Sequence, residues 1–172
     1  MSDTNPEFYK ELRNRYLPKQ LKVIFILESP PTNGGYFYDE SGKPSELLFR
    51  SMISALLNIK PSTKKEGLQK FADAGFIIIN PIYIPVDKLP DKEADNLILK
   101  NYPNFIDDLN QIVRGKKIDL ILIKKNICAL LENRLANDGF NVLNHGLSLP
   151  FPMHYYFEDF RKKLNSLIVQ NK

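Results

Sequence analysis

Three side chains of this sequence have the functional groups of a reactive site: Glu28 and Asn80, which directly follow apolar runs, and His145, which follows one after a single asparagine. A carboxylate can position or activate water, and an imidazole can donate a hydrogen bond to a developing oxyanion. An amide offers one donor and one acceptor, which suits the edge of a planar base. The three residue types predict hydrolytic or base-recognition chemistry if the fold brings them together.

Four short apolar runs, rich in β-branched and aromatic residues, predict the strands of the fold: residues 23–27, 76–79, 118–123 and 140–143. The run at residues 23–27 is continuously apolar rather than alternating, which is typical of a strand covered by helices on both faces. Each run is followed by polar residues. Ligand sites of open parallel sheets lie at the carboxyl ends of strands, so we expect the site there.

Segments with helical spacing of apolar residues separate these runs: residues 7–16, 47–57, 64–74, 91–99, 102–113, 124–138 and 155–169. Asp91 is a candidate helix cap, and Gly75 and Gly139 are expected to end helices in the left-handed conformation. Strands that alternate with helices imply parallel pairing through right-handed crossovers. The sequence therefore predicts one domain over residues 1–172, a three-layer α/β/α sandwich around a central four-stranded parallel sheet.

Composition narrows the class of protein. The chain has 172 residues, 43% of them hydrophobic and 26% charged, which is ordinary for a globular domain. The apolar runs are too short to span a membrane, and the N-terminus does not resemble a secretory signal, so we expect a cytoplasmic monomer without a membrane partner. Cys128 is the only cysteine and is expected to be a buried thiol. The net charge of +4 is compatible with a polyanionic partner.

With this order of elements, residues 21–168 resemble the uracil-DNA glycosylase superfamily, in particular the branch whose first motif reads Gly-Glu-Ala-Pro-Gly. Leu27-Glu28-Ser29-Pro30-Pro31 stands in the place of that motif, Asn80-Pro81 follows the second strand, and the last motif begins at His145-Gly146-Leu147-Ser148. Leu27 replaces the glycine of the first motif, and Gly146 replaces the proline that usually follows the histidine. Because the iron–sulfur branch needs four cysteine ligands, the resemblance is to a divergent, cluster-free member.

The resemblance implies a DNA repair enzyme that hydrolyses the N-glycosidic bond of uracil or a related damaged base in single- or double-stranded DNA. It implies no cofactor and no metal. Glu28 would position the attacking water, and His145 would donate a hydrogen bond to uracil O2. Asn80 would read the O4 and N3–H edge of the base, with Ser29 and Pro30 beside it in the substrate pocket.

Two further contacts follow from the same resemblance. A base must leave the duplex before its glycosidic bond can be reached, and an aromatic side chain then stacks on it. Phe37 is the first candidate for that ring and Tyr36 the second. The loop that contains Ser148 and Leu149 occupies the place of an apolar wedge inserted into the minor groove, with Leu149 at its tip.

Each of these residues also has a structural interpretation. Glu28 could accept hydrogen bonds from loop amides, Asn80-Pro81 is a common turn pair, and a single histidine is more often structural than catalytic. Residues 36–38 could form a hydrophobic cluster beneath a long loop, and His154 has no functional context. The charges at Lys64-Lys65 and at residues 114–117 are most simply solvated, although a basic groove would use the same residues on phosphates.

Two other functions remain open at this point. A non-catalytic module of the same fold could bind nucleic acid or a free nucleobase. A generic nucleotide-binding domain is the last alternative, because the sequence has neither a Gly-x-Gly-x-x-Gly turn nor a Gly-Lys-Ser/Thr phosphate loop.

Overall fold

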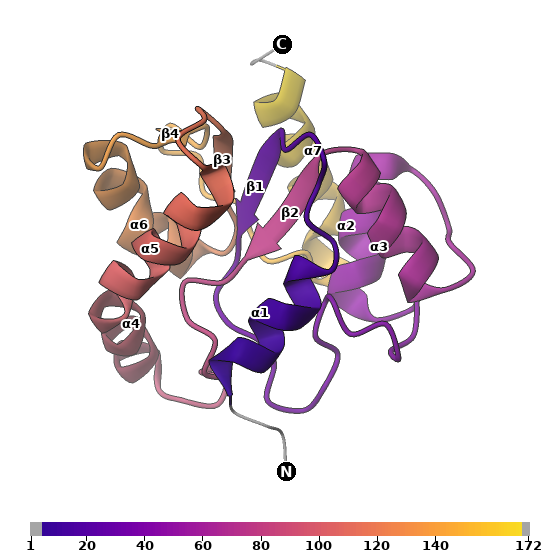
Figure 1. Cartoon of the computed structure of the whole chain (residues 1–172), viewed down its shortest axis with the longest axis horizontal. Coiled ribbons are helices and arrows are strands. Elements are labelled where there is room, and N and C mark those ends of the chain that lie inside the picture. The colour runs from indigo at the N-terminus through magenta and orange to yellow at the C-terminus, as the bar shows by residue number, and fades with distance from the viewer. Residues whose placement is uncertain (1–4, 170–172) are drawn as a thin grey trace.

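A parallel sheet of four short strands forms the centre of the molecule (Figure 1). The computed structural model describes residues 5–169. The strands are β1 Val23–Ile26, β2 Phe76–Ile79, β3 Asp119–Leu122 and β4 Asn141–Val142, in the order β2-β1-β3-β4. β1 pairs in parallel with both β2 and β3, and β3 pairs in parallel with β4. The predicted sheet is therefore confirmed, including its four strands and their parallel direction.

Helices cover both faces of this sheet. Figure 1 shows α1 and α5 in front of it and α2 and α7 behind it. The helices are α1 Pro6–Asn14, α2 Leu47–Leu57, α3 Lys64–Asp73, α4 Asp91–Lys100, α5 Tyr102–Val113, α6 Lys125–Asn137 and α7 Phe157–Val169, with a 3-10 turn η1 at His154–Tyr156. The fold is thus the expected three-layer α/β/α sandwich. Among residues 5–169, no helix combines the length and the apolar character needed to cross a membrane.

The helix ends follow the local chemistry of the sequence. Gly75 and Gly139 both have φ of 89°, a left-handed conformation that favours glycine, and each comes just after a helix as expected. Asp91 is not the cap of α4. Pro90 takes that position, and Asp91 lies in the first turn, where its negative charge is favourable beside the helix dipole.

The last strand is shorter than predicted because a side chain replaces part of its backbone pairing. Beyond Val142, the side-chain amide of Asn144 binds the backbone of Leu122, accepting from its N–H at 2.8 Å and donating to its C=O at 3.0 Å. Asn144 also donates to the C=O of Leu147 at 3.0 Å. This buried amide closes the ladder of β3 and turns the chain into the next loop.

One buried ion pair joins the helices in front of the sheet. Arg13 of α1 donates two hydrogen bonds to Asp108 of α5, at 2.7 and 2.9 Å, and a third to the Tyr83 hydroxyl at 2.6 Å. Burial alone would lower the pKa of Arg13, but the hydrogen bond to Asp108 and the nearby Tyr83 and Asp108 charges raise it above its ordinary value. The guanidinium therefore stays charged and ties α1 to α5.

Lys64 corrects the expectation that the Lys64-Lys65 pair is solvated. Its side chain is fully buried, and its ammonium donates to the C=O of Tyr36 at 2.7 Å and to Glu46 at 2.8 Å. A buried charge needs such partners because its hydration is lost. Lys64 thus fastens the long loop after β1 to the start of α3, while Lys65 remains exposed.

We expect Asp108→Ala to lower the free energy of unfolding by about 3–5 kcal/mol, because it leaves the guanidinium of Arg13 buried without its carboxylate. Asp159→Ala, which removes a half-exposed ion pair with Lys163, is the control and should cost less than about 1 kcal/mol. Urea unfolding followed by circular dichroism measures both. Equal midpoints for the two variants would show that the pair between α1 and α5 is no stronger than a surface pair.

Candidate functional site

The Glu28 carboxylate lies at the carboxyl end of β1, and its hydrogen bonds link the end of β1 to the segment that follows β3. Its Oε1 accepts a hydrogen bond from Lys124 Nζ at 2.6 Å, and its Oε2 accepts one from Asn126 Nδ2 at 2.6 Å. Both partners follow β3, the neighbour of β1. The Glu28 side chain is 12% exposed. Each carboxylate oxygen keeps a free lone pair, so the group can still accept from a water or a substrate.

Asn126 contributes an unused acceptor to this cluster. Its Nδ2 donates to Asp95 of α4 at 3.2 Å as well as to Glu28, which fixes the orientation of the amide because both carboxylates need a donor. The Oδ1 atom is then buried with no hydrogen-bond partner among the described residues. Buried polar atoms are rarely left unpaired, so the Asn126 amide is the incompletely bonded group of this cluster.

Lys124 has a strained backbone at the point where β3 passes into α6. Its φ of 85° and ψ of 132° lie in a region that residues other than glycine rarely adopt. No side chain caps the start of α6, where backbone N–H groups carry a partial positive charge. Glu28 therefore lies beside two sources of positive potential, the ammonium of Lys124 and the first turn of α6.

Ser29 and Pro30 hold the loop after β1 rather than opening toward a ligand. The Ser29 hydroxyl accepts from the N–H of Val86 at 3.2 Å and donates to the C=O of Pro30 at 3.2 Å, and Pro30 is buried. Asp87 supports the same junction by accepting from the N–H of Thr32 at 3.1 Å. The loops after β1 and β2 are thereby joined to each other.

Asn80 lies at the end of β2 but belongs to a different cleft. It is 5% exposed, and its backbone N–H donates to the Tyr83 hydroxyl at 3.3 Å. With Tyr83, Asn101 and Phe105 it lines a cleft of about 370 Å³ beside α1 and α5. Glu28 is not among the residues that line this cleft.

His145 lies at the other edge of the sheet. It is exposed with φ of 45°, and the next residue, Gly146, donates its N–H to Glu132 of α6 at 2.7 Å. Because β2 and β4 are the two edge strands, the ends of their backbones are separated by three strand spacings, roughly 14 Å. Neither His145 nor Glu28 lines any of the clefts described here, so these clefts do not unite the predicted residues.

The expectation that Leu149 forms an exposed wedge is wrong. Its side chain is fully buried, and its C=O accepts from the N–H of Lys124 at 3.0 Å, which places it against the end of β3. Ser148, half-buried, lies beside Cys128. Burial raises the pKa of the Cys128 thiol, although hydrogen bonds from the Leu149 backbone and the Ser148 side chain oppose the shift. Cys128 is the buried thiol that the sequence predicted.

The predicted stacking residues are also part of the core. The ring of Phe37 packs against Phe49 at 5.6 Å and Phe71 at 5.2 Å between centroids, and Tyr36 donates to the C=O of Tyr9 at 3.2 Å. Both are buried, so neither offers a free face to a base. The interpretation of residues 36–38 as a hydrophobic cluster is the correct one, although it forms part of the main core.

The residues that sequence reasoning missed are Lys124, Asn126 and Asp95. Lys124 and Asn126 stand at a predicted strand end, which was the signal available for them. Nothing in the sequence singled out Asp95, because it lies in the middle of a helix rich in charged residues and follows no strand. Among residues 5–169, no group of three or more histidine, cysteine or acidic side chains is arranged to hold a metal ion.

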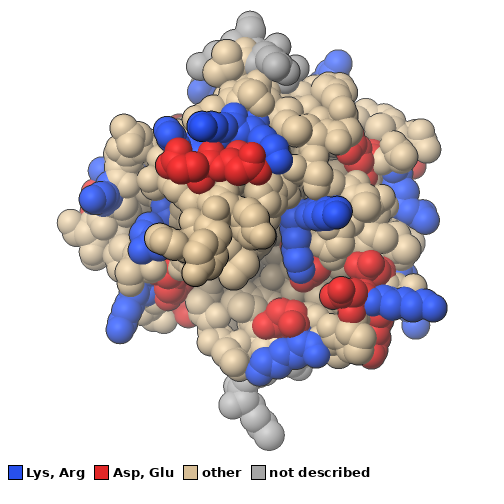
Figure 2. Space-filling model, turned by 180° about the vertical axis from the view of Figure 1, so that it is seen from behind, with Lys and Arg blue, Asp and Glu red and all other residues tan. Residues whose placement is uncertain are grey.

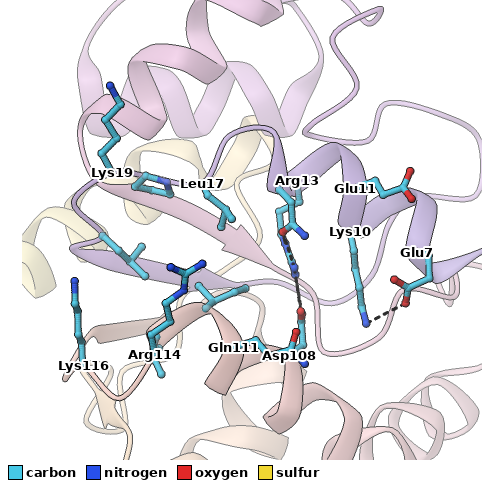
Figure 3. A pocket seen from close by; sticks show the side chains of 15 residues that line it. Glu7, Lys10, Glu11, Arg13, Leu17, Lys19, Asp108, Gln111, Arg114 and Lys116 are labelled. Carbon is cyan, nitrogen blue, oxygen red and sulfur yellow. Dashed lines mark hydrogen bonds and ion pairs between the residues drawn. The ribbon is translucent and has the colours of Figure 1, made fainter.

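A second polar cleft, of about 710 Å³, lies between α1 and α5 (Figure 3). Figure 3 shows the pair of Arg13 and Asp108 at its centre, and the basic residues Lys19, Arg114 and Lys116 at one end. That end adjoins the starts of β1 and β3 in the chain. It is therefore remote from the carboxyl edge that holds Glu28.

Comparisons of the chain with models of known protein families, with curated proteins and with solved structures found no match.

The strain at Lys124 predicts that a substitution there stabilises the fold, whereas most substitutions destabilise it. We expect Lys124→Gly to raise the free energy of unfolding by about 1 kcal/mol, because glycine adopts this backbone conformation without strain and the lost ion pair is partly exposed. Lys125→Gly, one residue into α6, should instead lower it by about 0.5–1 kcal/mol. Chemical denaturation of both variants measures the difference. Destabilisation of equal size at the two positions would contradict a strained Lys124.

Proposed function

We propose that this chain is a uracil-DNA glycosylase-like repair protein that hydrolyses the N-glycosidic bond of uracil or a related damaged base in DNA, without a cofactor. The observation that carries this proposal is the Glu28 carboxylate, held at the carboxyl end of β1 between Lys124 and Asn126. The four-stranded parallel sheet supports it, because its carboxyl edge, where Glu28 lies, is where ligands of such sheets bind.

Glu28 would act on the water. Cleavage breaks the bond between C1′ of the sugar and the base nitrogen, and the electron pair leaves with the base. The sugar becomes positive as this happens, so a nearby carboxylate stabilises it. Water then forms the new C1′–O bond and gives one proton to Glu28. The hydrogen bonds from Lys124 and Asn126 keep the carboxylate oriented for this step.

Lys124 would stabilise the leaving base. A departing uracil carries negative charge, which is favoured near an ammonium group and near the start of a helix. Lys124 and the first turn of α6 supply both beside Glu28. In the resemblance this role falls to His145, which lies exposed near α6 Glu132. The geometry therefore favours Lys124 for the electrostatic role.

Asn126 is a second candidate, beside Asn80, for contact with the base. Its Oδ1 is buried and unpaired, and a base could reach it only if the amide were uncovered. An amide oxygen accepts hydrogen bonds only, so it would then suit the N3–H of uracil and not the bare N3 of cytosine. Asn80 has the same amide chemistry but lies in the cleft beside Tyr83.

The proposal predicts that the protein releases uracil from oligonucleotides carrying one uracil, detected as strand breaks after alkali treatment of single- and double-stranded substrates. Glu28→Gln should slow this release by at least about 100-fold, the lower end of what a positioned acid or base contributes. Glu93→Gln, an exposed position on α4, is the matched control and should keep full activity. Purified protein that cleaves neither uracil nor hypoxanthine substrates would end the enzymatic proposal.

A second set of variants tests which positive group assists the leaving base. We expect Lys124→Met to lower the rate by more than about 100-fold, the effect of losing one preorganised electrostatic contact, and its neighbour Lys125→Met to have little effect. His145→Asn, which tolerates the left-handed backbone, should lower the rate less than tenfold. If His145→Asn is the more damaging change, the role belongs to the histidine and not to Lys124.

A non-catalytic module that binds nucleic acid or a nucleobase is the second candidate. Specific observations favour it, because the residues expected to stack on the base and to enter the duplex, Phe37 and Leu149, are buried in the core. Binding of uracil-containing DNA with no strand break after alkali would identify this function.

A further inference from the structure

Three exposed side chains gather on one short turn of the chain. η1 and the residue before it carry Met153, Tyr155 and Tyr156, which are 50%, 91% and 56% exposed. The Tyr155 ring contacts only the ring of His154 among the described aromatic residues, edge to face at 5.8 Å. Large side chains exposed together in this way, and not scattered singly, are typical of a binding surface.

This turn borders an apolar cleft of about 630 Å³. His154 and Phe157 lie on one side of the cleft, and Leu47, Phe49 and Ile59 from α2 and the segment after it lie on the other. A hydrogen bond from Ser51 of α2 to the C=O of Pro152, at 3.3 Å, fastens the turn to this position. The exposed rings are therefore held beside the cleft.

The charge of the cleft favours an anionic partner. Arg50 and Lys60 line it, and neither forms an ion pair with a described residue. Its one acidic residue, Glu158, is neutralised by Arg161 at 2.8 Å. Figure 2 shows the side of the molecule on which α7 lies, where acidic and basic side chains are interspersed across uncharged surface. That side carries no continuous patch of positive charge, so contacts with individual side chains must provide the affinity for an anionic partner.

From this arrangement we infer that the turn and the cleft bind a single-stranded segment of DNA, with bases stacked on Tyr155 and Tyr156 and phosphates near Arg50 and Lys60. Exposed aromatic faces beside unpaired cations are the combination that holds single strands, since every base has a face to stack. Bases within a duplex have no such face free. The inference rests on the proposed function only for its class of partner, and it needs no catalysis.

The position of the turn connects this surface to the candidate site. The backbone of Leu149 binds the strained Lys124 beside Glu28, and the chain reaches Met153 four residues later. Tyr155 thus lies six residues along the chain from Leu149, which is fixed at the strand end beside the carboxylate. The surface would retain unpaired DNA while one base is presented to Glu28.

The test measures the anisotropy of a fluorescein-labelled twelve-nucleotide oligothymidine, which holds no uracil and so reports binding without base release. We expect Tyr155→Ser combined with Tyr156→Ser to weaken binding roughly tenfold or more, and Tyr155→Phe to retain it, because stacking needs the ring and not the hydroxyl. Phe8→Ser, at an exposed aromatic on α1, should leave the affinity unchanged. The matching duplex should bind more weakly than the single strand.

The cations are tested by the salt dependence of the same binding. Arg50→Gln with Lys60→Gln should make the slope of log affinity against log salt less steep by about 1.4, since each phosphate contact of a single strand contributes about 0.7. Lys116→Gln with Lys117→Gln, at the opposite edge of the sheet, should leave the slope unchanged.

Three results would overturn the inference. They are unchanged affinity in the double tyrosine variant, loss of binding in the Lys116 and Lys117 variant instead, and self-association of the wild type that the double tyrosine variant abolishes. The last, seen by sedimentation, would mean that the rings contact a second copy of the chain. Loss of uracil release with intact oligothymidine binding would count against the proposed enzyme alone, so the two proposals can fail separately.

Discussion

Parallel pairing of β1 on both of its edges is the constraint on which the rest of the structure depends. A parallel strand with two neighbours has its backbone groups satisfied within the sheet and both of its faces buried by helices. All four residues of β1 are buried accordingly. The only place where such a strand meets solvent is its end. The residue after Leu27 is thus delivered, by the sheet itself, to the middle of the carboxyl edge.

The chain handles buried charge in two different ways. Arg13 and Lys64 are paired with carboxylates and further oxygens, so their donors serve the packing of helices and loops. The Glu28 cluster is less complete, because the amide oxygen of Asn126 is unpaired and the backbone at Lys124 is strained. Incomplete hydrogen bonding and strain occur together here, at the edge where parallel sheets commonly bind ligands, and they make this cluster the candidate site.

The sequence allowed the fold to be predicted closely, because apolar runs and glycine stops depend on local chemistry. Phe76–Ile79 and Tyr102–Val113 have the predicted bounds, whereas β3 and β4 are each two residues shorter than predicted. In β4 this leaves only two residues, because a side chain of a following residue replaces backbone pairing there. The site was less predictable. Position along a loop shows which strand end a residue follows, as for Glu28, but not whether its side chain turns inward. Phe37, Leu149 and Lys64 all turn inward because contacts from distant helices and strands bury them.

The amide of Asn144 has a consequence for how this molecule meets others. Outer strands of a sheet expose unpaired backbone groups that can recruit another chain and begin aggregation. Here β4 offers only two residues, and the next N–H and C=O on β3, those of Leu122, are already occupied by that amide. A strand from another molecule would find few unpaired backbone groups at this edge of the sheet. The Asn144 side chain thus protects this edge of the sheet, where a longer edge strand would have exposed backbone groups able to pair with another chain.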